Sequence, residues 1–212
     1  MALSLTRKLS HLEPKRYIDQ HIEIVERCKI GDRKAQYDLY KLYAKSMLNV
    51  SMRIVNHEAE AEDVLQDAFV DAFSNLHSFK GQSTFGAWLK QIVVNRAINQ
   101  VRQRKTQLVD IEDFDTDKID FADTESFDET QTDLDVQRIK KAMTQLPEGY
   151  RVVLSLYLFE GYDHEEIGEV LGINEATSRS QYMRGKKKLL EILEAPHPPE
   201  GGFLRGINKL GL

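Results

Sequence analysis

A run of acidic residues divides the chain into two parts. Residues 106–135 contain twelve Asp and Glu residues and one base, Lys118, so this segment carries a charge of −11. The whole chain carries −5, which leaves +6 on the remaining residues. A segment so rich in like charge has too little apolar surface to fold alone. The sequence therefore predicts two folded parts joined by an acidic flexible linker over residues 106–134.

The part before the linker has the apolar spacing of four α-helices. We expect them over residues 22–31, 32–55, 59–77 and 84–105, with a loop from Phe79 to Ser83 before the fourth. In the second helix the apolar set is Tyr37, Leu39, Tyr40, Leu42 and Tyr43. The third and fourth have the clearest stripes: Val64, Leu65, Ala68, Phe69, Ala72, Phe73 and Leu76, then Trp88, Leu89, Ile92, Val93, Ala97, Ile98 and Val101. Stripes of this period indicate helices packed around a shared core.

The part after the linker predicts shorter helices bounded by turn residues. They are expected at Leu134–Thr144, from an N1 proline (Pro147) through Leu158, from Asp163 to Leu171 and from Asn174 to about Leu193. Asp163 with Glu166 forms a capping box, Gly161 and Gly172 end helices, and Asn174 is an N-cap. With no strand pattern, the fold class is all-α. Two small helical domains are expected, at residues 1–105 (four helices) and 135–194, with an irregular tail at 195–212.

Composition excludes several classes of protein. The only cysteine is Cys28, which rules out an intrachain disulfide and fits a cytoplasmic location. We interpret it as a small buried apolar residue rather than a reactive thiol. No apolar run approaches the ~20 residues of a membrane span, so no membrane insertion is expected. No nucleophile–base pair, phosphate loop or set of metal ligands is visible, so we expect no enzyme activity, cofactor or metal.

The segment Asp163–Leu190 has the spacing of a helix-turn-helix. Two helices meet at a turn that holds Gly172, with small Gly168 where they approach and Ile167, Leu171 and Ile173 between them. The second helix opens on small polar residues and continues with cations, with no acid between Arg179 and Lys188. Small residues allow the backbone close to the major groove, where Arg and Tyr contact bases and phosphates. The alternative is an ordinary helical hairpin with a solvated basic face.

A second polar surface lies opposite the apolar stripe of residues 84–105. It contains amides and cations without acids: Lys90, Gln91, Asn95, Arg96, Asn99, Gln100, Arg102, Gln103 and Arg104. This composition suits contact with phosphates and bases. The preceding loop, FKGQSTF (Phe79–Phe85), is a polar loop between aromatics that could hold an unstacked base. A capping loop with a polar helix face explains the same residues equally well.

A third surface is acidic. The run AEAEDVLQDAF (Ala59–Phe69) places Glu60, Asp63, Gln66, Asp67 and, just beyond it, Asp71 opposite the core stripe. Carboxylates repel DNA, so this stripe favours docking on a protein, with a solvated face as the equal alternative.

These surfaces, in this order, resemble the extracytoplasmic-function (ECF) group of sigma-70 family RNA polymerase sigma factors. The resemblance covers roughly residues 32–105 and 136–193. It rests on AEDVLQDAFVDAF, on F-x-G followed by TFGAWLKQIVVNRAINQVRQRK, on LPEGYRVVLSLYLFEGYDHEEIGEVLGI and on TSRSQYMRGKKKLL. It implies a transcription initiation factor that binds core RNA polymerase and directs it to promoters. The first domain would correspond to sigma region 2 and the second to sigma region 4.

The resemblance also implies roles for individual residues. Asp63, Gln66 and Asp67 match the surface that docks on the β′ clamp helices of core polymerase, and the β flap is the second expected contact. The −10 promoter element would be melted and read by Lys80, Gln82, Ser83, Asn95, Arg96, Asn99 and Arg102. The −35 element would be read by Thr177, Ser178, Arg179, Ser180, Tyr182, Arg184 and Lys186. Partners are therefore core polymerase, promoter DNA and an anti-sigma factor.

Two positions depart from the family's pattern. The family usually has Val, packed between the two helices, where this chain has Ser178, and Ala176 or Tyr182 would have to fill that space. A frequent Arg is replaced by Gln181, which removes a phosphate contact or a base preference. Two rival functions are a self-sufficient helix-turn-helix regulator, and an adaptor whose helices bind only protein.

Overall fold

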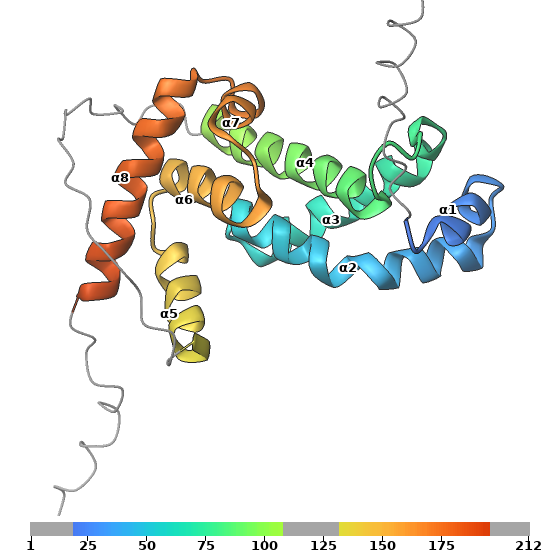
Figure 1. Ribbon diagram of the computed structural model, residues 1–212, viewed down its shortest axis with the longest axis horizontal. Helices are drawn as coiled ribbons and strands as arrows, with labels where there is room; N and C mark the ends of the chain where they lie inside the picture. The colour runs from blue at the N-terminus through green and yellow to red at the C-terminus, as the bar shows by residue number, and fades with distance from the viewer. Residues whose placement is uncertain (1–18, 108–131, 196–212) are drawn as a thin grey trace, which may run out of the picture.

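The structure is a computed structural model and describes residues 19–107 and 132–195. All regular elements in these ranges are helical (Figure 1). In chain order they are α1 (Ile22–Lys29), α2 (Arg33–Val55), α3 (Glu58–Ser74), the 3-10 turn η1 (Leu76–Ser78), α4 (Phe85–Gln107), α5 (Thr132–Thr144), α6 (Glu148–Ser155), the π turn η2 (Leu156–Glu160), α7 (His164–Leu171) and α8 (Glu175–Glu194). The all-α prediction is confirmed. The tail predicted at 195–212 and most of the acidic linker lie outside the described residues.

The N-terminal half packs α2, α3 and α4 around one apolar core. The stripes predicted for α3 and α4 are correct: their residues are buried, except that Phe73, Trp88 and Ile92 are half-buried, and Val94 joins them. The face predicted for α2 is partly wrong, because Tyr37, Tyr40 and Leu42 are exposed. The residues of α2 that reach the core are Ala35, Leu39, Met47, Val50, Ile54 and Val55.

Capping residues set the helix ends largely as predicted. Asp163 forms the reciprocal capping box with Glu166, and Asn174 caps α8. Asp32 is a further N-cap that the sequence did not predict: it accepts hydrogen bonds from the backbone N–H groups of Lys34 and Ala35. Two boundaries differ. Pro147 is the N-cap of α6 rather than its first helical residue. Beyond Ser155 the chain widens into the π turn η2 instead of continuing as an α-helix.

Cys28 is buried on α1, as predicted. Burial raises the pKa of its thiol to about 11, with smaller contributions from nearby acids. The thiol therefore stays protonated near neutral pH, which fits an unreactive core residue. None of the described helices is both long and apolar enough to cross a membrane.

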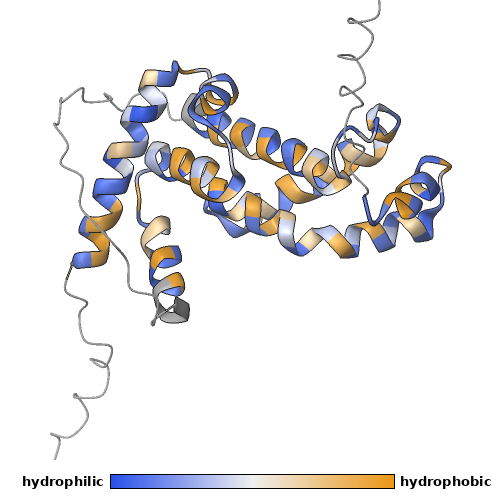
Figure 2. Cartoon of the chain, viewed as in Figure 1, coloured by the Kyte–Doolittle hydropathy of each residue, from blue (hydrophilic) through white to orange (hydrophobic). Residues whose placement is uncertain are grey.

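The two halves share part of one core. Val152 and Leu156 from the C-terminal half, together with Val153 and Ile167, belong to the same buried cluster as the side chains of α2, α3 and α4. Helix α6 lies against α2, and α7 against the end of α4 (Figure 1). In Figure 2, α8 is hydrophilic along most of its length and hydrophobic near its C-terminal end. The sequence predicted two separate domains, whereas here they are in direct contact.

Polar contacts reinforce this junction. Arg53 of α2 donates from Nε and Nη2 to one carboxylate oxygen of Glu160, at 3.0 and 2.5 Å, and only 2% of the Glu160 side chain is exposed. The ammonium of Lys90 donates to the Glu160 carbonyl at 2.7 Å. Both cations come from the N-terminal half, so Glu160 joins the two halves through its side chain and its backbone.

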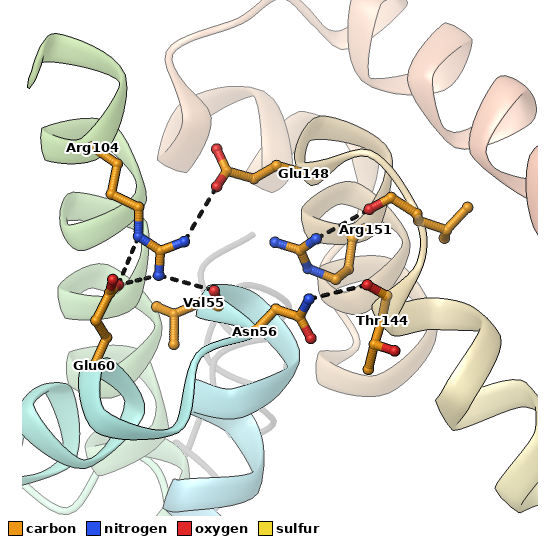
Figure 3. Close-up of polar contacts among 8 residues, drawn as sticks. Val55, Asn56, Glu60, Arg104, Thr144, Glu148 and Arg151 are labelled. Carbon is orange, nitrogen blue, oxygen red and sulfur yellow. Dashed lines mark hydrogen bonds and ion pairs between the residues drawn. The ribbon is translucent and has the colours of Figure 1, made fainter. Parts of the chain in front are cut away.

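A second set of polar contacts is shown in Figure 3. Arg104 of α4 donates to Glu60 and to the Val55 carbonyl within its own half, and its Nη1 lies 3.6 Å from the carboxylate of Glu148 on α6. The amide of Asn56 donates to the Thr144 carbonyl at 3.0 Å. These contacts involve backbone carbonyls near helix ends, which need donors when they are shielded from water.

We expect the substitution Arg53→Met to lower the free energy of unfolding by about 2–3 kcal/mol, because it leaves the Glu160 carboxylate buried without its cation. This loss of stability is smaller than for a fully buried ion pair, because 32% of the Arg53 side chain is exposed. Urea unfolding measures it. The matched control is Lys188→Met, which breaks a pair that is half exposed on both sides and costs at most about 0.5 kcal/mol. Equal losses in the two variants would contradict this role for Arg53.

Candidate nucleic-acid interface

Helices α7 and α8 form the predicted helix-turn-helix. Gly172 ends α7 in the left-handed conformation, with φ +69°, and the N–H of Ile173 donates to the carbonyl of Gly168 at 3.0 Å. A Cβ on Gly168 would lie 2.8 Å from the Ile173 carbonyl oxygen, so only glycine fits where the turn folds back. Ile167 is fully buried beneath the turn. The sequence located this motif and its glycines correctly.

The residues of α8 that were predicted to contact the −35 element differ in how exposed they are. Arg179, Ser180 and Lys186 are exposed, whereas Thr177, Tyr182 and Arg184 are half-buried. Arg179 forms an i,i+4 ion pair with Glu175, and its side chain remains 65% exposed. Exposed pairs of this kind are weak, so the guanidinium is free to exchange its partner for a phosphate or a base edge.

Ser178 does not belong to this face. It is fully buried, and its hydroxyl lies 3.0 Å from Nδ1 of His164, the first residue of α7. The prediction that Ser178 contacts DNA is therefore wrong. A polar contact between the two helices takes the place of the apolar Val that is usual in the family.

An aromatic cluster completes this packing. The imidazole of His164 stacks on Tyr157 of η2 with ring centroids 4.7 Å apart, and Tyr182 of α8 packs against both rings. Burial raises the pKa of the Tyr182 phenol, with a smaller effect from Tyr157. Of the two residues expected to fill the space beside Ser178, Tyr182 contributes through this cluster, whereas Ala176 is exposed. The tilt of α8 therefore depends on Tyr157 and His164, which lie outside the recognition helix.

Gln181 also points away from the −35 face. Only 9% of it is exposed, and it lines a cavity of about 100 Å³ between α4, α6 and the turn before α8. The cavity is bounded by Ile98, Val101, Arg102, Glu148, Gly149, Val152, Leu171, Ile173 and Gln181. The interpretation of Gln181 as a lost phosphate contact is not supported by this position.

Helix α4 carries the predicted −10 face. Asn95, Arg96, Asn99 and Arg102 are all exposed on the side opposite the core. Arg102 also donates to the Val170 carbonyl of α7 at 2.8 Å, so the end of this face touches the C-terminal half. Two further cations of the helix, Lys90 and Arg104, contact residues of the C-terminal half.

The loop before α4 has buried ends and a polar tip. Phe79 and Phe85 are 4% and 0% exposed, and their rings pack against each other and against Trp88. Lys80 and Gln82 are exposed, and Ser83 is half-buried. The aromatics therefore anchor the loop in the core, and the groups available to a base are those of the tip.

The predicted docking residues share one side of α3. Asp63, Gln66 and Asp67 are exposed at i, i+3 and i+4 spacing. This side adjoins the α4 face: Arg96 pairs with Asp71 at 2.5 Å and lies 3.9 Å from Asp67. The structure thus brings the acidic surface and the predicted −10 surface side by side.

The sequence missed Asp19, Glu160 and His164. Asp19 and Glu160 are each 6% exposed, and both have partners far along the chain. An acid that directly precedes a helix-ending glycine, as Glu160 precedes Gly161, gives no sign of a buried ion pair. For His164 the sequence did offer a signal. Ser178 replaces the Val that is usual in the family, and a buried polar side chain needs a polar neighbour to bond with.

Comparison with known proteins agrees with this architecture. Residues 39–107 match the family described as Sigma-70 region 2, and residues 136–189 match Sigma-70, region 4. The RNA polymerase sigma-H factor of Pseudomonas aeruginosa is 33% identical over 190 residues, which cover 83% of this chain and 95% of that protein. The ECF RNA polymerase sigma factor SigW of Bacillus subtilis is 28% identical over 80% of this chain and 94% of its own length.

A solved structure has a similar fold. The sigma factor RpoE of Bartonella quintana, determined in complex with the anti-sigma factor NepR, superimposes with a TM-score of 0.50 at 24% identity. The superposition covers 76% of this chain and 98% of that one. The chain belongs to the sigma-70 family of RNA polymerase sigma factors, in its extracytoplasmic-function subfamily. It is therefore a promoter-directing transcription initiation factor, and the alternative of a self-sufficient helix-turn-helix regulator is not favoured.

Two serines of α8 separate a packing role from a surface role. We expect Ser178→Ala to lower the free energy of unfolding by about 1 kcal/mol, because the half-buried imidazole of His164 loses its partner. Ser180→Ala removes an exposed hydroxyl bonded to the Ala176 carbonyl and should change it by less than about 0.5 kcal/mol. Urea unfolding of both variants is the measurement. A Ser178 variant as stable as the Ser180 variant would contradict the packing role.

Proposed function

We propose that the two faces divide promoter recognition between them. The exposed residues of α8, Arg179, Ser180 and Lys186 with half-buried Thr177, Tyr182 and Arg184, read the duplex −35 element in the major groove. Asn95, Arg96, Asn99 and Arg102 of α4, with Lys80, Gln82 and Ser83 of the loop, melt and read the −10 element. The observation that carries this proposal is the presence of two cationic surfaces, one in each matched region, with amides beside the cations on α4 and hydroxyls beside them on α8.

The chemistry differs between the two faces. In the major groove each base pair presents a distinct pattern of donors, acceptors and methyl groups, which Arg and Tyr side chains are able to distinguish. A melted −10 element instead offers unstacked bases, which polar groups of a loop contact along their hydrogen-bonding edges. Phosphate contacts add affinity that depends on salt at both sites.

The two domains must move apart to do this. Centres of the −10 and −35 elements are separated by about 25 base pairs, or about 85 Å of B-form DNA. Here the end of α4 touches α7, which packs on α8, so the two faces lie within about one helix length, about 35 Å. We infer that core polymerase holds the domains apart and that the contact between the halves belongs to the free protein.

We assign further features on the same basis. The domains run over residues 1–105 and 135–194, on either side of the acidic linker at 106–134. The protein acts in the cytoplasm, contacts the β′ clamp helices and the β flap, and catalyses no reaction itself. An anti-sigma factor is a third partner, in keeping with the complex formed by RpoE of Bartonella quintana with NepR.

The test is a reconstituted transcription assay. Bacterial core polymerase transcribes a library of genomic fragments with and without this protein, and the start sites are sequenced. We expect new start sites that share a two-block motif upstream. Binding to core without any protein-dependent start site would overturn the promoter-directing role of these faces.

Reversing charge on α8 should abolish these start sites. We expect Arg184→Glu with Lys186→Glu to remove specific starts while leaving binding to core intact, since the two residues face DNA and not polymerase. Lys186→Ala alone should weaken duplex binding of the holoenzyme evenly across sequences and reduce its log–log salt slope by about 1. Lys140→Glu on exposed α5 is the matched control. An adaptor that binds only protein would be unaffected by every one of these changes.

Reversing charge on α3 should act on polymerase instead. We expect Asp63→Lys with Asp67→Lys to weaken binding to core polymerase by at least about tenfold, because like charges across an interface cost several kcal/mol. Glu23→Lys on α1, exposed and outside the acidic face, is the control. Fluorescence anisotropy with labelled protein gives the affinities. Unchanged affinity in the double variant would remove α3 from the docking surface.

A further inference from the structure

The loop proposed to capture a −10 base is held at both ends by the short segment Asp19–Lys29. Asp19 is 6% exposed, and its Oδ2 accepts the backbone N–H of Phe85, the first residue of α4, at 2.5 Å. Its Oδ1 accepts the N–H of His21 at 2.8 Å. At the other end of the loop, the ammonium of Lys29 donates to the Phe79 carbonyl at 3.3 Å.

The contact of Asp19 is a helix cap supplied from 66 residues away. The first N–H groups of a helix have no partner within it, and a negative charge is favoured at that end. Thr84 already accepts from the N–H of Ala87 as the local cap. Asp19 therefore satisfies a different donor, that of Phe85, which is buried and out of reach of water.

Aromatic packing locks the same junction. Nδ1 of His21 lies 3.0 Å from the Tyr43 hydroxyl, and the Tyr43 ring packs edge-on against Phe85 at 5.3 Å. A Cβ on Gly86 would lie 2.8 Å from the Tyr43 ring, so glycine is required for Tyr43 to come this close to α4. Lys29 also lies over the Phe79 ring, at 5.7 Å.

The tip of the loop has little else to fix its shape. In the part of the chain that the structure describes, no backbone–backbone hydrogen bond involves Lys80, Gly81, Gln82 or Ser83. Gly81 has φ +69°, and Lys80 and Gln82 are exposed. A segment with few backbone hydrogen bonds has low local stability, so its conformation depends on how its ends are held.

We propose that Asp19 is a positioning residue for −10 recognition, with Lys29 as its counterpart at the other end of the loop. The two side chains fix Phe85 and Phe79, and thereby the loop tip that receives the unstacked base. This inference rests on the proposed function, because it concerns the same loop, and it adds a determinant of base selectivity that itself contacts no DNA. A loop free to sample other shapes would accept more bases and hold each less well.

The experiment measures base selectivity directly. Holoenzyme reconstituted from core polymerase and the full-length chain is incubated with a single-stranded DNA library randomised over six positions, and the bound fraction is sequenced. The variants are Asp19→Ala, Asp19→Asn and Lys29→Met. The matched control is Glu23→Ala, which removes an exposed acid from the same segment. Binding of each variant to core is measured in parallel.

We expect Asp19→Ala to reduce the preference for the selected base at one position about fivefold, the effect of one lost helix cap. Asp19→Asn keeps one acceptor oxygen and should restore part of that preference. Lys29→Met should lower the preference at the same position, and Glu23→Ala should match the wild type. Recovery by Asn is the result that a merely structural role would not give in base selectivity.

Other outcomes separate the two proposals. If Asp19→Ala does not fold or does not bind core, Asp19→Asn and Lys29→Met decide the matter. Unchanged selectivity in both of these, with normal binding to core, overturns the positioning role. A wild-type holoenzyme that selects no sequence at all would instead overturn the assignment of the loop to −10 recognition.

Discussion

A charged carboxylate enclosed between helices has to be matched by a cation, and the carboxylate of Glu160 is matched by Arg53. Its side chain pairs with Arg53, while Lys90 binds its carbonyl, so α2 and α4 both hold the end of the π turn. The same turn carries Tyr157, on which His164 stacks and against which Tyr182 packs at a tilt. The tilt of the recognition helix and the contact between the two halves thus depend on one short stretch of chain, residues 156–160.

The contact between the two halves has a consequence for promoter binding. The contact consists of a partly shared core and a buried ion pair, and it keeps the two faces proposed to bind DNA far closer together than the two promoter elements. If these faces read the promoter as proposed, binding to polymerase and DNA has to outweigh the free energy that the junction contributes. Ser155 and Arg53 illustrate the coupling: the serine hydroxyl donates to the arginine carbonyl, so separating the halves also breaks this bond.

Local signals in the sequence predicted much of the fold. Asp163, Asn174 and Gly172 each act within a few residues of their own position, and the structure has them where the sequence placed them. The local sequence pattern did not predict contacts between residues far apart in the chain. Tyr37 and Leu42 were expected in the core of α2 but are exposed, because which side of a long helix is covered depends on where its neighbours lie. Ser178 was wrongly expected to contact DNA, because its partner, His164, belongs to another helix and the packing of two helices is not visible in the local pattern.

The acidic and cationic surfaces of the N-terminal half are linked by ion pairs. Arg96, assigned to the −10 element, pairs with Asp71 and approaches Asp67, assigned to polymerase docking. The Arg96 side chain is 42% exposed, so its ion pairs are weak and exchange readily for stronger ones. If polymerase engages Asp67 as proposed, the charge that helps hold Arg96 against α3 is taken up by the partner. Arg96 then has more freedom to contact a phosphate or a base, which couples docking to DNA contact through side chains alone.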